Sequence, residues 1–167
     1  LETSLSAFGC GECGGNLLNL VAYRLWRELH APEVEKETAL VSEPEEGRDA
    51  LLCSRCKRIM LKFRYTADTE HVVDVCNYCE DIWMQENEWE FMKSISLHGD
   101  IPKIFTEPWQ RDLRSQRTRQ ALEKEWERRL GPELHTRAKE LAVWLEEQPQ
   151  RDSLLDYLSS RDPYSAS

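Results

Sequence analysis

The sequence predicts an α+β fold in which a small antiparallel hairpin with two cysteine pairs is followed by a helical C-terminal segment. Three observations predict it. Pairs with the same two-residue spacing stand at Cys53 and Cys56 and at Cys76 and Cys79. Between the pairs, apolar and polar residues alternate as they do in β-strands. After residue 107, apolar residues recur at helical spacing instead.

The four cysteines have the spacing of a four-thiolate zinc site. Cys53, Cys56, Cys76 and Cys79 spell C-x2-C-x19-C-x2-C. Two intervening residues allow a tight turn, called a knuckle, that directs both sulfurs at one ion, and two knuckles complete a tetrahedron. Four thiolates leave no open coordination position, so the predicted Zn²⁺ is structural. Two disulfides or a redox C-x2-C are the alternatives, but these are typical of secreted domains and of a βαβ context respectively.

The interval between the cysteine pairs indicates two strands and a turn. Alternation over residues 57–65 places four apolar residues on one face, namely Ile59, Leu61, Phe63 and Tyr65. The stretch "TADTE" is typical of a turn, and "HVVDV" alternates again. Pairing of the two strands would bring the two knuckles together. The predicted element is a zinc ribbon, an antiparallel hairpin with two C-x2-C knuckles.

Residues 53 to about 99 resemble the transcription-factor-IIB-type zinc ribbon domains found in many bacterial proteins. The matching stretches are "CSRCKRIM", "HVVDVCNYC" and "DIWMQENEWEFM". The resemblance implies a ribbon with a trailing helix and, by name alone, a transcription-associated role. The sequence departs from the family pattern at four positions, namely Glu80, Asp81, Gln85 and Asn87. Glycines usually occupy the first two positions, and Asp and Gly usually occupy the last two.

Cys10 and Cys13 form a third pair with the same spacing. The stretch "CGECGGNLLNLVAYRLWREL" resembles the second knuckle of another ribbon of this family, followed by a strand and a short helix. This interpretation makes Cys10 and Cys13 metal ligands and places the first half of that ribbon upstream of Leu1. The alternatives are a site completed by His30 or another histidine and a pair of unligated thiols.

Composition divides the chain into four predicted segments. Residues 1–30 hold a partial ribbon knuckle and a short helix, residues 31–49 an acidic linker, residues 50–100 the zinc ribbon with its trailing helix, and residues 107–160 a helical hairpin or three-helix unit. The linker has seven acidic and two basic residues, a composition that cannot bury a core.

The C-terminal segment predicts three helices with apolar stripes. The stripe residues are Leu122, Trp126 and Leu130 in the first helix, Leu134, Ala138, Leu141, Ala142 and Leu145 in the second, and Leu154, Leu155 and Leu158 in the third. Short helices are marginal in isolation, so these stripes must pack against one another, the ribbon or another chain. Trp109 and Trp144 are the predicted anchors of a protein interface, since tryptophan is enriched at interface centres.

Composition and motifs favour a non-enzymatic protein. The net charge is −9, and the sequence has no phosphate-binding glycine loop, G-x-S-x-G or H-E-x-x-H motif. The acidic excess disfavours nucleic acid as the main partner. No apolar run could span a bilayer, and the first residues lack the features of a signal peptide, which predicts a cytoplasmic protein.

The sequence therefore predicts a zinc-binding protein-interaction module whose partner is another protein or a second copy. It gives no sign of a membrane or a small-molecule substrate. The alternative is a zinc-ribbon protein that binds nucleic acid through a basic strand, whose cationic residues are Arg55, Lys57, Arg58, Lys62 and Arg64.

Overall fold

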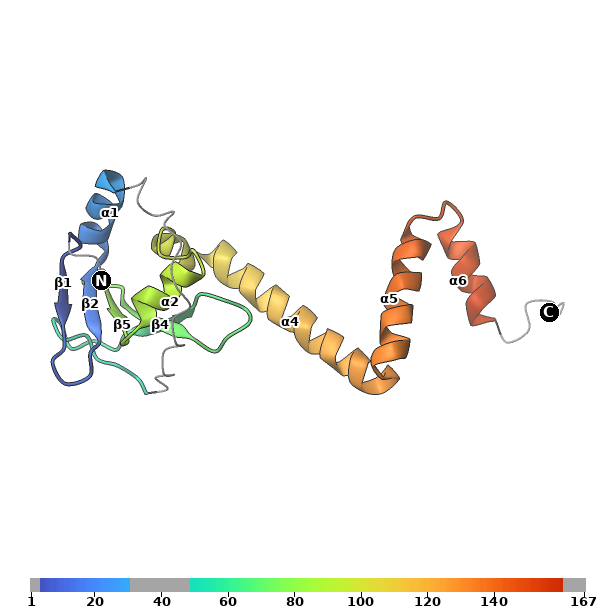
Figure 1. Cartoon of the computed structure of the whole chain (residues 1–167), viewed down its shortest axis with the longest axis horizontal. Coiled ribbons are helices and arrows are strands. Elements are labelled where there is room, and N and C mark those ends of the chain that lie inside the picture. The colour runs from blue at the N-terminus through green and yellow to red at the C-terminus, as the bar shows by residue number, and fades with distance from the viewer. Residues whose placement is uncertain (1–3, 31–48, 161–167) are drawn as a thin grey trace. The chain divides into compact units, whose positions relative to one another are not determined.

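The computed structural model describes residues 4–30 and 49–160 and divides into two compact units, Leu1–Arg117 and Thr118–Ser167 (Figure 1). The first unit contains a β-sheet and the helices packed on it. The described part of the second unit is helical. The predicted acidic linker lies outside the described residues, apart from its last residue. No helix within the described ranges is long and apolar enough to cross a membrane.

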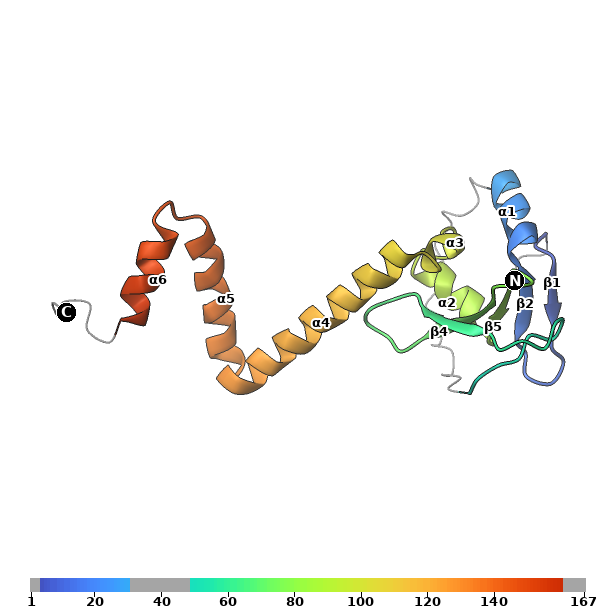
Figure 2. The ribbon, with the colours of Figure 1, turned by 180° about the vertical axis from the view of Figure 1, so that it is seen from behind.

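The sheet of the first unit has five antiparallel strands in the order β1-β2-β5-β4-β3, and Figure 2 shows part of it from behind. The strands are β1 Ala7–Gly9, β2 Asn16–Asn19, β3 Leu61–Arg64, β4 Val72–Cys76 and β5 Asp81–Met84. Pairing of β2 with β5 joins the N-terminal segment to the ribbon segment. The structure therefore differs from the predicted division between residues 1–30 and 50–100, because the two segments share one sheet.

The predicted hairpin is present as β3 and β4, in which Phe63 lies opposite Val73. Val73 and Val75 are buried as expected. The first strand is shorter than predicted, and its pattern breaks near the knuckle: Met60 is buried, whereas Ile59 is 66% exposed. The break arises because the chain folds back on itself there, in an isolated bridge between Leu52 and Ile59.

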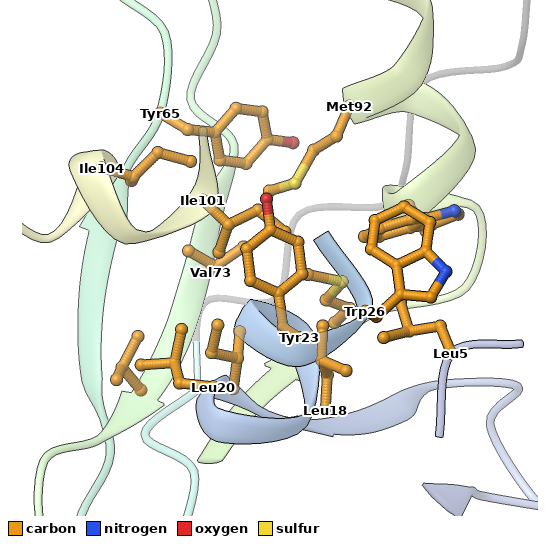
Figure 3. Packing of buried hydrophobic residues seen from close by; sticks show 14 of the residues in the cluster. Leu5, Leu18, Leu20, Tyr23, Trp26, Tyr65, Val73, Met92, Ile101 and Ile104 are labelled. Atoms are coloured by element: carbon orange, nitrogen blue, oxygen red, sulfur yellow. The ribbon is translucent and has the colours of Figure 1, made fainter. Parts of the chain in front are cut away.

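Three helices contribute to the core of the first unit: α1 Leu20–Leu29, α2 Glu88–Ser94 and α3 Ile101–Ile104. Figure 3 shows Tyr23 and Trp26 of α1 close to Met92 of α2 and Ile101 of α3. The Tyr23 hydroxyl donates a hydrogen bond of 2.7 Å to the His98 carbonyl, which ties α1 to the loop after α2. Large buried rings and aliphatic side chains of this kind supply most of the apolar burial that stabilises a small unit.

The α1 helix begins where its sequence provides an N-cap. The side chain of Asn19 accepts hydrogen bonds from the backbone amides of Val21 and Ala22, which satisfies two of the free donors at the helix start. Further along, α2 ends at Ser94, and Pro102 lies in the first turn of α3. Proline is tolerated there because the first amides of a helix have no intrahelical acceptor.

The strand register separates the two faces of the sheet. Phe8, Leu17, Trp83, Asp74 and Lys62 lie opposite one another across all five strands, in that order. Directly opposed residues of an antiparallel sheet point to the same side. Neighbouring positions along each strand, including Leu18, Val75 and Ile82, point to the other side and enter the core. The row from Phe8 to Lys62 therefore belongs to the face opposite the core.

Gly15, immediately before β2, lies close to the Trp83 side chain of this row. A Cβ atom on Gly15 would lie 2.3 Å from Cζ2 of Trp83. We predict that Gly15→Ala lowers the free energy of unfolding by about 1–3 kcal/mol, because the indole must move to make room. Urea denaturation of zinc-saturated protein would measure the change. Gly11→Ala is the matched control, since a Cβ there would meet nothing within 4 Å, and equal effects of the two substitutions would contradict the prediction.

The C-terminal helices lie close to their predicted positions: α4 Glu107–Leu130, α5 Pro132–Glu146 and α6 Arg151–Ser159. Their apolar stripes are largely uncovered. Leu145 is the only buried residue among the described residues 118–160. Trp144 is 47% exposed, whereas Trp109 is half-buried and packs against the core of the first unit.

Candidate metal centre

The four predicted cysteines converge on one point. The sulfur atoms of Cys53, Cys56, Cys76 and Cys79 all lie within 4.8 Å of one another, and those of Cys56 and Cys76 are 3.5 Å apart. A tetrahedron with Zn–S bonds of about 2.3 Å has S–S edges of about 3.8 Å. The four sulfurs, called here the four-cysteine site, are therefore close enough to hold a metal ion. The prediction that these residues come together is confirmed.

Backbone turns direct both members of each pair toward this point. In the first knuckle, the Lys57 amide donates a hydrogen bond of 2.8 Å to the Cys53 carbonyl, and in the second the Glu80 amide donates one of 2.9 Å to the Cys76 carbonyl. Lys57 and Glu80 both have left-handed φ values, 62° and 54°. Non-glycine residues adopt this conformation with strain, so the turns of both knuckles hold a strained residue directly after the second cysteine of the pair.

The four-cysteine site is enclosed partly by apolar side chains and partly by paired charges. Met60 is buried with Cys53 and Cys76, and Trp83 packs beside them. Arg55 forms an ion pair of 3.2 Å with the buried carboxylate of Asp81. The Arg58 guanidinium lies 3.8 Å above the Tyr78 ring, a favourable cation–π distance.

The Cys79 thiol resists ionisation. Burial, together with hydrogen bonds that the Cys79 thiol donates to the other three cysteines, raises the pKa of Cys79 to about 12. A divalent ion that binds here must therefore displace protons. Since proton release is favoured at high pH, metal binding should weaken as the solution becomes more acidic.

Cys10 and Cys13 form a third knuckle of the same kind, called here the N-terminal knuckle (residues 10–14). The Gly14 amide donates a hydrogen bond of 3.1 Å to the Cys10 carbonyl, and Gly14 has a φ of 69°. Backbone amides of Glu12 and Cys13 also face the Cys10 sulfur, and these hydrogen bonds lower the pKa of Cys10 below its ordinary value. Within the described ranges, however, the two thiols belong to no group of three or more ligand atoms.

His30 does not complete the N-terminal knuckle in this structure. Its ring stacks on Trp26 with a centroid distance of 5.5 Å, and its Nδ1 lies 2.9 Å from the Trp26 carbonyl. These contacts hold the ring at the end of α1. The alternative in which His30 is the third ligand therefore has no geometric support.

The N-terminal knuckle and the second knuckle belong to two similar halves of the sheet. The chain runs β1, knuckle, β2 and α1 in one half, and β4, knuckle, β5 and α2 in the other. Leu17 and Trp83, each seven positions after the first cysteine of its pair, lie directly opposite each other where β2 meets β5. This register places an approximate two-fold axis between them. The equivalence supports the interpretation of residues 10–14 as a ligand-bearing turn.

Most of the predicted basic strand is already paired with protein groups. Lys62 lies 3.0 Å from Asp74, Arg55 pairs with Asp81, and Arg64 pairs with Glu70. Arg58 stacks on Tyr78, as described above, and Lys57 is exposed within the first knuckle. The strand thus does not present five unneutralised cations to a phosphate backbone.

Sequence reasoning missed three buried acids of the first unit, Asp74, Asp81 and Glu88. Asp74 is 1% exposed and Glu88 is 2% exposed. Burial raises the pKa of Asp74, and the nearby Lys62 ammonium offsets part of that effect. A sequence signal for Asp74 does exist. It is an acid within the apolar stretch "HVVDV" that lies opposite a lysine on the neighbouring strand.

Glu88 makes stability depend on pH. Burial raises its pKa from 4.5 to about 8, although its Oε2 accepts a hydrogen bond of 2.8 Å from the Gln85 amide. The folded state therefore holds a proton that the unfolded state releases between these pH values, so stability should fall as the pH rises through that window. Glu88→Gln keeps an acceptor and cannot ionise.

We predict that the loss of stability of the unmodified protein between pH 6 and 8 exceeds that of Glu88→Gln by about 2 kcal/mol. Thermal denaturation of the zinc-saturated proteins across this range would measure the difference. Parallel pH profiles for the two proteins would contradict the prediction.

The fold and this centre together define an α+β protein with a five-stranded antiparallel sheet and a four-cysteine cluster that could bind a metal ion. No family model matches the sequence, and no curated protein or solved structure is significantly similar to it. Its function must therefore be inferred from the chain's own residues.

Proposed function

We propose that this chain is a non-enzymatic, zinc-stabilised module that binds another protein through its C-terminal helices. The observation that carries the zinc assignment is the convergence of four cysteine sulfurs within 4.8 Å. Thiolates are soft ligands, and a closed set of four is typical of structural zinc. Such a site leaves no coordination position for a substrate, which favours a structural role over a catalytic one.

The environment of the two buried histidines supports the non-catalytic interpretation. His71 stacks on Tyr65 and makes an edge contact with Phe91, and His98 makes an edge contact with Trp89. Both histidines are 5% exposed. Their rings serve as part of the packed core.

Binding of another protein is supported by the apolar side chains of the second unit. Seven large apolar residues of α5 and α6 are exposed, namely Leu134, Leu141, Val143, Trp144, Leu155, Tyr157 and Leu158. Helices of 15 and 9 residues rarely persist in water without tertiary packing. A partner chain, or a second copy, that covers these side chains would provide the missing core.

Nucleic-acid binding through the basic strand is the weaker candidate. Three of its five cations are engaged in ion pairs, and a fourth stacks on tyrosine. If the strand nevertheless binds nucleic acid, affinity should fall steeply with salt concentration. Reversing the charges of Lys57, Arg58 and Lys62 should then abolish it.

Elemental analysis and cross-linking together test the proposed function. The purified chain should contain zinc that is lost on Cys76→Ala. A photo-reactive residue at position 144 should cross-link to a specific protein, and Trp144→Ala should weaken that complex while zinc content stays unchanged. Absence of zinc would contradict the metal assignment, and a complex insensitive to position 144 would contradict the docking role of α5.

A further inference from the structure

The N-terminal knuckle is a preformed half of a metal site. Its turn has the same amide-to-carbonyl hydrogen bond and the same left-handed residue as the two knuckles of the four-cysteine site. A second hydrogen bond of 2.7 Å, from the Cys10 amide to the Gly15 carbonyl, matches one of 2.8 Å from the Cys53 amide to the Arg58 carbonyl. Two thiolates, however, fill only half of a tetrahedral zinc site.

Among the described residues, no further ligand atom joins the sulfurs of Cys10 and Cys13 in a group of three or more. The sequence contains six cysteines, and four of them converge in the other site. Of its four histidines, His71 and His98 are buried in the core and His30 is held against Trp26. The fourth, His135, lies on α5 of the second unit. Two thiolates supplied by another molecule would complete the N-terminal knuckle.

A second copy can supply these ligands in a suitable geometry. A four-thiolate site made of two knuckles has approximate two-fold symmetry, so two identical knuckles can form it about an exact two-fold axis. The turn projects from the sheet with four consecutive exposed residues, Gly11 to Gly14. A Cβ on Gly11 would meet nothing within 4 Å, so this tip is open to approach.

The charge of the N-terminal knuckle predicts that zinc binds there more weakly than in the four-cysteine site. Glu12 occupies the knuckle position that Arg55 occupies in the first knuckle of the four-cysteine site. Two Glu12 carboxylates near four thiolates would repel one another, whereas the first knuckle of the four-cysteine site has a basic residue at the same position. An ion shared by two chains should therefore be the first removed by a chelator.

We propose that one zinc ion joins two copies of this chain through Cys10 and Cys13 of each, in addition to the ion in each four-cysteine site. The inference rests on the proposed zinc assignment of the four-cysteine site. It identifies a second copy of the chain as the partner at this surface.

Zinc stoichiometry and mass together test the proposal. Full-length protein purified under reducing conditions with excess zinc chloride, then freed of unbound metal, should contain about 1.5 zinc ions per chain and sediment as a dimer. Cys13→Ser should contain about 1.0 ion per chain and sediment as a monomer. Trp144→Ala should behave like the unmodified protein, which separates this contact from association through the helices.

Reversing the charge of Glu12 should strengthen the zinc site that two copies share. Glu12→Arg should dimerise at a several-fold lower protein concentration and retain the bridging ion at higher chelator concentration. The proposal is overturned if the unmodified protein and Cys13→Ser have the same zinc content and mass, or if a monomer holds two ions. A Cys13→Ser protein without zinc would contradict the zinc assignment of the four-cysteine site instead.

Discussion

Cys76→Ser is expected to remove the metal from the four-cysteine site and to unfold the ribbon. Cys76 is 1% exposed at the end of β4, where it faces Asp81 of β5 in the sheet register. A serine hydroxyl is a poor zinc ligand at neutral pH, so the remaining three thiolates would hold the ion weakly. Structural zinc contributes apparent binding free energy of about 10 kcal/mol or more, which is comparable to the whole stability of a small domain.

The effect of Cys76→Ser is measured by zinc content and by urea denaturation of the first unit. Cys13→Ser is the matched control, because it makes the same chemical change in the N-terminal knuckle. Unfolding of the first unit should follow only from Cys76→Ser. A Cys76→Ser protein that keeps one zinc ion per chain and the unmodified denaturation midpoint would show that this cysteine is not a ligand.

The second large effect is expected from Lys62→Met. The Lys62 ammonium lies 3.0 Å from each carboxylate oxygen of Asp74, whose side chain is almost wholly buried. Removing Lys62 leaves the buried Asp74 carboxylate without its partner charge. Because the Lys62 side chain is 28% exposed, we expect the loss of stability, about 1–3 kcal/mol, to be smaller than for a fully buried pair. We therefore expect a marked fall in the denaturation midpoint of zinc-saturated protein.

Lys103→Met provides the comparison for Lys62→Met. Lys103 pairs with Asp100 at 2.8 Å, but the two side chains are 66% and 40% exposed. Exposed pairs contribute about 0–1 kcal/mol, so this variant should be close to the unmodified protein. If both lysine variants lose the same small amount of stability, then Asp74 does not depend on Lys62 for compensation.

The position of the buried acids suggests how the first unit is organised around its sheet. Asp74 lies in the row that also contains Trp83 and Leu17, opposite the main core. Asp81, at the next position of the same face, accepts a hydrogen bond of 2.8 Å from Asn19 and pairs with Arg55. These polar contacts join β2, β5 and the first knuckle, so the two halves of the sheet are linked by charge as well as by backbone pairing.

Local features of this protein could be predicted from its sequence. The knuckles were predictable because the doubled C-x2-C spacing is typical of a zinc site and each turn is set by a few backbone torsions. The helices α4, α5 and α6 were predictable because apolar spacing and the Gly-Pro step at 131–132 act within a single segment. The hairpin β3–β4 followed from alternation between two turns.

Only the tertiary structure decided how distant segments meet. Pairing of β2 with β5 joins residues more than sixty positions apart. The residue pattern of each strand does not indicate which other strand it pairs with. For the same reason, the sequence did not show that the basic strand is neutralised by Asp74, Asp81 and Glu70, or that Glu88 is buried. Burial and ion pairing depend on which surfaces come together, whereas knuckles and helices depend on neighbours along the chain.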